Sequence, residues 1–309
     1  MVALIVVLSV VFLIFMVMLY FFCFTFVRLN IGNFDDVNDP CNRVLGEYKE
    51  VVGKGIERIN STPCKWVETY SFDKLCLKAR YFDNGQKNTM IFFHGYRSSS
   101  SRDFSCALRM YTDLGFNVLL VDQRAHGRSE GKLITFGIKE SRDVVSWTEF
   151  LNKKYSPEKI LISGMSMGAT TVLMAAGNYK LPENVKAVVA DCGFTSPVEI
   201  IKSVAKNFLK IKADLFIPFL NVFCLLFGGF SIMKVSTLNG LKNCDLPILF
   251  IHGEEDTFVP CEMSRQAFEV CSDKCRIETV EGAYHGMSFL KDENKIATAI
   301  KEFVINCGF

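Results

Sequence analysis

The chain has 309 residues, a net charge of +2 from 35 Lys and Arg against 33 Asp and Glu, and a mean hydropathy of +0.22. The charge balance excludes the strongly positive surface that nucleic-acid binding requires. The 50% share of hydrophobic residues excludes a disordered or collagen-like chain and indicates that part of the chain contacts lipid.

The N-terminal segment predicts a membrane anchor. Residues 2–27 contain no charged residue, and a helix over them is roughly 39 Å long, more than a hydrocarbon core of about 30 Å. A cleaved signal peptide is the alternative, but it requires an early Lys or Arg and small residues at the cleavage site, which residues 22–27 do not provide. We therefore assign residues 1–28 to a single transmembrane anchor.

The body that follows the anchor is expected in the cytoplasm. Arg28 and Arg43 follow the apolar segment and no Lys or Arg precedes it, which favours this side. Eleven of the twelve cysteines come after the segment, at irregular spacings and in odd number, as is typical of thiols in a reducing compartment. We predict a single-pass protein of the cell membrane.

Residues 29–64 predict a juxtamembrane linker and a lead-in helix, the latter over residues 44–59. A strand hairpin with Asp73 and Lys74 in its turn follows, and short apolar strands then alternate with helical segments through residues 65–309. This alternation predicts the α/β class, with a mostly parallel sheet and helices on both faces. Strands are predicted at residues 66–72, 75–82, 90–93, 118–121, 160–163, 187–190, 248–251 and 277–280, and helices near residues 107, 145, 172, 267 and 299.

A strand and a helix meet at Ser166 in the sequence Gly-Met-Ser-Met-Gly. A nucleophile at such a turn has a strained backbone, and the residues two positions before and after it must be very small for strand and helix to cross. Gly164 and Gly168 satisfy this requirement. The following helix N-terminus directs NH groups toward an anion beside the serine. Ser166 is therefore the candidate nucleophile, because an ordinary N-cap serine, the alternative, does not require these glycines.

A serine nucleophile needs a base, and the base needs an acid that orients it. In hydrolases with such a turn the order is serine, acid, histidine, and only His285 of the four histidines lies beyond every plausible acid. The acid is expected just after the strand at residues 248–251. We select Asp256 there, with Glu255 and Asp191 as alternatives.

Three further segments resemble motifs of the α/β-hydrolase superfamily. Residues 92–96 (FFHGY) are similar to its H-G-x oxyanion turn, residues 122–129 (DQRAHGRS) to its D-x-R-x-H-G-x-S loop, and residues 252–260 (HGEEDTFVP) to its acid loop. The resemblance covers roughly residues 66–306. It is greatest to bacterial membrane-anchored hydrolases of the serine aminopeptidase-like branch.

The resemblance implies roles for individual residues. Asp256, rather than Glu254 or Glu255, is the implied acid, and the backbone NH groups of Tyr96 and Met167 are the implied oxyanion hole. No metal or organic cofactor is needed. The resemblance also implies that the insertion at about residues 197–245 is a cap over the active site.

Other polar residues are expected to support loops. His94, His126 and His252 stand beside glycines at strand ends and are expected to be hydrogen-bonded turn supports. Asp122 and Arg124 are expected to form an internal ion pair with each other.

The centre of the insertion, residues 215–227, is rich in Phe and Leu but is interrupted too early for a second bilayer crossing. It is either a lid that faces the membrane and shelters an acyl chain, or a segment that packs on the sheet. The expected function is a membrane-anchored serine hydrolase that cleaves a carboxylic ester, with a small-molecule, lipid or other hydrophobic acyl substrate. A serine peptidase of the aminopeptidase-like type, a transacylase and a non-catalytic membrane-tethered binding module are the alternatives.

Overall fold

An eight-stranded sheet forms the centre of the computed structural model, which describes residues 1–29, 32–271 and 273–309. The strand order is β1-β2-β4-β3-β5-β6-β7-β8. β1, β2 and β4 pair antiparallel, and the pairs from β4 through β3 to β8 are parallel. The strands are β1 (Lys65–Tyr70), β2 (Cys76–Phe82), β3 (Asn88–Phe93), β4 (Phe116–Asp122), β5 (Ile160–Met165), β6 (Val185–Asp191), β7 (Ile248–Gly253) and β8 (Arg276–Val280).

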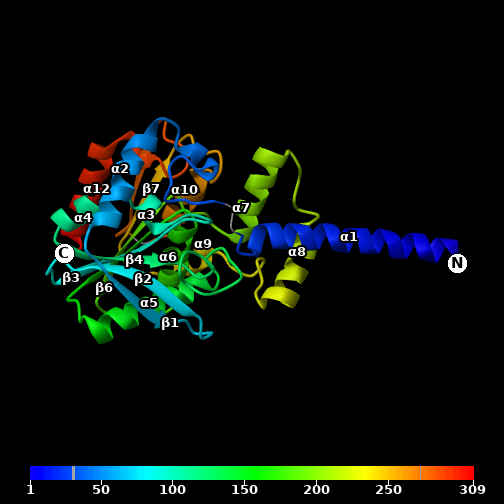
Figure 1. The fold of residues 1–309 in the computed structure, drawn as a ribbon, viewed down its shortest axis with the longest axis horizontal. Helices are drawn as coiled ribbons and strands as arrows, with labels where there is room; N and C mark the ends of the chain where they lie inside the picture. Colours follow the sequence, from blue (N-terminus) through cyan, green and yellow to red (C-terminus); the bar gives the residue numbers. More distant parts are fainter. Residues whose placement is uncertain (30–31, 272) are drawn as a thin grey trace.

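Helices cover both faces of the sheet, so the predicted fold class is confirmed (Figure 1). The central strands are apolar on both sides because each face meets a helical layer. One core cluster joins the sheet to α5 (Glu140–Lys154), α6 (Met167–Asn178) and α10 (Glu262–Glu269). A second cluster joins the other face to α2 (Lys49–Ser61), α4 (Leu108–Asp113) and α12 (Glu293–Asn306).

The lead-in segment begins differently from the prediction. Its α-helix, α2, starts only at Lys49, and a short 3₁₀ segment, η1 (Pro40–Tyr48), precedes it. The reason is Gly46, whose φ of 51° and ψ of −121° interrupt helical geometry. Two short helices, α3 (Ser100–Asp103) and α11 (Ser288–Lys291), follow β3 and β8.

Most of the insertion between β6 and β7 stands beside the sheet, whereas its last helix, α9, packs on α6 in the body. In Figure 1 α7 and α8 flank the inner part of α1 (Val2–Phe26), and α8 lies alongside it. Among the described residues, α1 is the one helix long and apolar enough to cross a membrane. The insertion consists of α7 (Pro197–Val204), a π-helical turn η2 (Ala205–Leu209), α8 (Ile217–Phe223), a second π-helical turn η3 (Cys224–Gly228) and α9 (Thr237–Leu241).

Candidate active site

Ser166 lies at the sharp turn between β5 and α6. Its φ of 54° and ψ of −117° are strained values for a residue with a side chain. A Cβ atom on Gly164 would lie 2.3 Å from the Gly168 backbone, and one on Gly168 would lie 1.9 Å from the carbonyl oxygen of Phe93. Both glycines are therefore required for β5, α6 and β3 to approach this closely.

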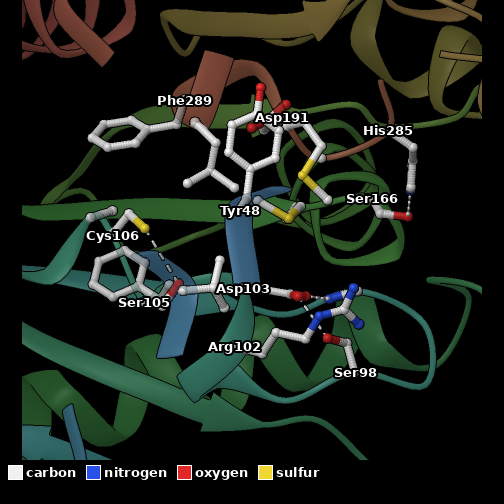
Figure 2. A pocket seen from close by; sticks show the side chains of 18 of the residues that line it. Tyr48, Ser98, Arg102, Asp103, Ser105, Cys106, Ser166, Asp191, His285 and Phe289 are labelled. Atoms are coloured by element: carbon white, nitrogen blue, oxygen red, sulfur yellow. Dashed lines mark hydrogen bonds between the residues drawn. The ribbon is translucent and has the colours of Figure 1, made fainter. Parts of the chain in front are cut away.

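A chain of hydrogen bonds joins three residues that are far apart in the sequence. The Ser166 Oγ lies 2.9 Å from Nε2 of His285, and Nδ1 of His285 lies 2.6 Å from Oδ2 of Asp256. Figure 2 shows the contact of His285 with Ser166 at one end of a cavity. With Asp256 ionised, Nδ1 carries the proton and Nε2 is free to accept from the serine hydroxyl. This arrangement makes the hydroxyl more nucleophilic.

Asp256 is held in place by several donors. Its Oδ1 accepts hydrogen bonds from the backbone NH groups of Phe258 and Val259, and Nε2 of His252 lies 3.2 Å from its Oδ2. Burial raises the pKa of this carboxyl, but the hydrogen bonds from His252 and His285 outweigh burial and lower the pKa to about 2. Asp256 is therefore ionised throughout the neutral range.

The alternative acids occupy other positions. Glu254 and Glu255 are exposed. Asp191 lies at the end of β6 on the cavity wall, and its Oδ1 has no hydrogen-bond partner among the described residues. Burial raises the pKa of the Asp191 carboxyl to about 7. Among the candidate carboxylates in the described part of the chain, Asp256 is the one that hydrogen-bonds the His285 ring.

The turn after β3 approaches Ser166 through Gly95. A Cβ atom placed on Gly95 would lie 3.5 Å from the Ser166 Cβ, so the peptide that leads to Tyr96 stands beside the serine. Met167 is the first residue of α6, and the NH of a first helical residue has no acceptor within its own helix. The two amides proposed from the sequence are thus on the two backbone segments next to Ser166.

Asp103 holds this turn and is not among the residues predicted from the sequence. Its Oδ2 accepts from the Gly95 NH at 2.7 Å, and its Oδ1 accepts from the Ser98 hydroxyl at 2.6 Å. Asp103 lies in the short helix α3, eight residues beyond Gly95, and no local pattern in the sequence marks it. The contact depends on how the chain folds back after β3.

His94 and His126 support the same region, as predicted. The backbone NH of Gln123 donates to Nε2 of His94, and the NH of Arg97 donates to Nε2 of His126. Burial is the largest cause that keeps the pKa of His126 well below its usual value, so this ring is neutral. The two rings pack edge to face with centroids 4.8 Å apart.

The expected ion pair between Asp122 and Arg124 is wrong. Arg124 instead pairs with Asp143 of α5 at 2.6 Å and with Asp73 of the hairpin turn at 2.9 Å. Asp122 accepts from the backbone NH of Arg128. Asp122 is the last residue of β4 and Arg124 lies just beyond the strand end, where the chain turns and its side chains meet different neighbours.

One further combination of ligand atoms occurs at the site. The Cys192 thiol, Asp256 and His285 lie within 4.8 Å of one another. Burial raises the pKa of the Cys192 thiol well above its usual value, which disfavours the thiolate that a metal would need. The hydrogen bond between Asp256 and His285 already accounts for the position of these two groups.

A cavity of about 720 Å³ opens beside Ser166 and is mostly apolar. It lies on the face of the sheet that α2, α4 and α12 cover and extends toward the lead-in segment. Figure 2 shows Phe289 and Cys106 on the side away from Ser166. Leu45, Tyr48 and Val52 of the lead-in segment form part of its wall. Its other apolar lining includes Phe104, Tyr111, Met287, Phe289, Ile296 and Ile300.

The family model for the alpha/beta hydrolase fold matches residues 88–243, slightly more than half of the chain. Together with the sheet order and the turn at Ser166, this match shows that the chain belongs to the α/β-hydrolase family.

Individual relatives are distant. The chain is 28% identical to the protein YqkD of Bacillus subtilis over 220 residues, which cover 71% of this chain and 72% of YqkD. It is 21% identical to the lysophosphatidylserine lipase ABHD12 of Danio rerio over 187 residues, 59% of this chain and 47% of that protein. The chain thus spans less than half the length of this lipase. The esterase Pf2001 of Pyrococcus furiosus has a similar structure, with a TM-score of 0.66 and 27% identity over 81% of this chain and 93% of the esterase.

Proposed function

We propose that this protein is a membrane-anchored serine hydrolase that cleaves a carboxylic ester through an acyl-enzyme. The observation that carries the proposal is the hydrogen-bond chain from Ser166 through His285 to Asp256. A module that only binds ligands has no need for a serine, a histidine and a carboxylate joined in this order.

The proposed reaction has two steps. The Ser166 Oγ attacks the ester carbonyl carbon while His285 Nε2 takes the hydroxyl proton, and Asp256 stabilises the resulting imidazolium. The NH groups of Tyr96 and Met167 stabilise the oxyanion. His285 then protonates the leaving alcohol, and a water molecule activated by the same histidine releases the acid.

The proposed substrate carries a hydrophobic acyl or alkyl group. The apolar cavity beside Ser166 supports this, because burial of apolar surface favours binding by about 25 cal/mol per Å². The names of the lipase ABHD12 and the esterase Pf2001 point in the same direction. A peptidase of the aminopeptidase type is less well supported, because the cavity is mostly apolar. Of its carboxylates, Asp103 already accepts from Gly95 and Ser98, and burial raises the pKa of Asp191, which disfavours the charged form that would bind an amine.

The membrane assignment rests on α1. This helix of 25 residues is strongly apolar, with a mean hydropathy of 3.3 over its most apolar window. Its outer part projects from the body (Figure 1), so without a bilayer these apolar side chains would be exposed to water. We propose that α1 crosses the membrane once, with the body in the cytoplasm. Protease treatment of sealed, right-side-out vesicles tests the side, because digestion of the body from outside would refute a cytoplasmic location.

Labelling with a fluorophosphonate probe tests the nucleophile. Ser166→Ala is expected to abolish labelling while the thermal unfolding temperature stays close to that of the parent chain. Ser156→Ala, at an exposed serine outside the site, is the matched control and should label fully. Labelling that survives Ser166→Ala would refute the assignment. Absence of turnover with p-nitrophenyl esters of every chain length, and with amide and thioester controls, would support a binding module instead.

A further inference from the structure

The inner half of α1 is part of the folded body. Met18, Phe22 and Phe26 are buried in a cluster with the insertion, and the ring of Phe15 lies 5.2 Å from that of Phe223 in α8. Residues 2–14 are therefore the part of α1 that projects beyond these ring contacts. Figure 1 shows this part extending away from every other element.

The projecting part is too short to cross a bilayer. Its thirteen residues, 2–14, form a helix of roughly 20 Å, whereas a hydrocarbon core is about 30 Å thick. If α1 spans the membrane, the hydrocarbon must extend along α1 past Phe15 toward Phe22. These two residues contact α8 and η3 of the insertion through Phe223 and Phe227. The insertion therefore has to lie at the depth of the hydrocarbon.

The outer surface of the insertion is apolar, as a surface in contact with the hydrocarbon layer needs to be. Large apolar side chains that project from it are between 42% and 73% exposed. So many exposed apolar residues on neighbouring elements are unusual for a surface in water. We call this surface the cap face; it consists of Phe208, Leu209, Ile211, Leu215, Phe216, Phe219, Val222, Leu225, Leu226 and Phe227.

The charged residues near the cap face suit a lipid headgroup region. Lys206, Lys210 and Lys212 are exposed and alternate in sequence with the apolar residues around Phe208. Lysines in such positions extend their ammonium groups toward lipid phosphates while their methylene groups stay in the apolar layer. Asp214, the one acid in the sequence of residues 206–227, forms an ion pair with Lys202 at 2.9 Å.

We propose that the cap face inserts into the same leaflet of the membrane as the inner part of α1. Two elements of the chain, α1 and the insertion, then anchor the protein in the bilayer. This inference rests on the proposed membrane crossing of α1 and not on the proposed chemistry. The occupant of the cap face is the lipid bilayer, because the face is continuous with the surface of α1 through the contacts of Phe15 and Phe22.

The hydrogen bonds at the end of α1 keep the two elements together. Arg97 donates to the carbonyl oxygens of Phe24 and Val27, and Arg28 donates to those of Gly127 and Ser129. Because these bonds join α1 to loops of the sheet, the helix cannot pivot away from the insertion without breaking them. These bonds therefore fix the position of the sheet relative to the inner end of α1.

The cap face also reaches the active site. Phe208 is 57% exposed and at the same time lines the cavity beside Ser166. Its ring contacts that of Phe258 at 5.8 Å, and the Phe258 ring lies 5.1 Å from the ring of His285. An insertion at lipid depth would place the cavity mouth where a hydrophobic substrate can enter from the bilayer.

Quenching of tryptophan fluorescence in vesicles tests the inference on the full chain. Leu226→Trp reports on the cap face, Leu13→Trp on α1, and Ile305→Trp on α12, which lies on the opposite side of the body (Figure 1). Each variant is reconstituted into phosphatidylcholine vesicles with brominated or ordinary acyl chains. The parent chain, with Trp66 and Trp147, gives the background, and thermal unfolding confirms that each variant folds.

We expect brominated lipid to quench Leu226→Trp and Leu13→Trp more than the parent chain, and to leave Ile305→Trp at the background. Quenching of Leu13→Trp without quenching of Leu226→Trp would refute insertion of the cap face while leaving the anchor in place. In that case a concentration-dependent dimer in detergent would identify a second copy as the occupant. Absence of quenching at Leu13→Trp would refute the membrane crossing of α1 itself.

Discussion

The hydroxyl of Tyr96 donates a hydrogen bond of 2.9 Å to the carbonyl oxygen of Thr25. The two residues are 71 positions apart in the chain. Tyr96 supplies one of the proposed oxyanion NH groups, and Thr25 lies in the last turn of α1. The segment that would stabilise the oxyanion is therefore hydrogen-bonded directly to the proposed membrane helix. The next residue, Arg97, donates a hydrogen bond to the carbonyl oxygen of Phe24 in the same turn.

This bond predicts a small catalytic effect when the hydroxyl is removed. Tyr96→Phe keeps the backbone NH, so ester turnover should change less than about tenfold, and stability should fall by about 1 kcal/mol. His285→Ala removes the base and should lower kcat by about 10⁴-fold or more. Steady-state kinetics with a p-nitrophenyl ester measure both variants. A larger loss for Tyr96→Phe than for His285→Ala would contradict a backbone role for Tyr96.

The lead-in segment should influence substrate length. Val52 is 2% exposed and lines the cavity, so Val52→Phe should fill part of it and lower the preference for long over short acyl esters about tenfold in kcat/KM. Val51 is the neighbouring residue and is 53% exposed, so Val51→Phe is the matched control. Equal chain-length profiles for the two variants would show that this part of the cavity does not hold the acyl group.

Close backbone contact at the serine turn predicts a strong effect of one methyl group. Gly168→Ala would place a Cβ atom 1.9 Å from the Phe93 carbonyl oxygen and should lower the free energy of unfolding by on the order of 3 kcal/mol. Gly53→Ala, in α2, meets only Val37 at an ordinary 3.5 Å and should stabilise the helix by up to about 1 kcal/mol. Chemical denaturation of both variants provides the comparison; a tolerated Gly168→Ala would disprove the packing argument.

Asp191 predicts a dependence of stability on pH. Burial raises the pKa of its carboxyl from 3.8 to about 7, so between these values the native state keeps a proton that the unfolded chain has lost. Its contribution to stability therefore falls as the pH rises through this window. Asp191→Asn cannot ionise, so its stability relative to the parent should increase by on the order of 1–3 kcal/mol between pH 4 and pH 8. Thermal unfolding at both pH values measures this, and a constant difference would contradict the raised pKa.

Much of the fold was predictable because its signals are local. Apolar strands such as the one at residues 160–163 and the glycines around Ser166 show in the sequence which segments are buried and where the strand turns into a helix. The α1 helix was predictable for the same reason, since length and hydropathy are properties of one segment. Gly46 shows the limit, because the backbone angles of a glycine are not determined by its side chain.

The sequence by itself determined the fold class, the family resemblance and the three residues selected for the site. Only the tertiary structure decided that Asp103 holds the Gly95 turn, that Arg124 pairs with Asp143, and that the lead-in segment forms a wall of the cavity. It also decided that the insertion packs along α1 with its apolar face outward. The physical reason is the range of the interaction: helix and strand patterns arise within a few residues, whereas these contacts join segments whose distance depends on the path of the whole chain.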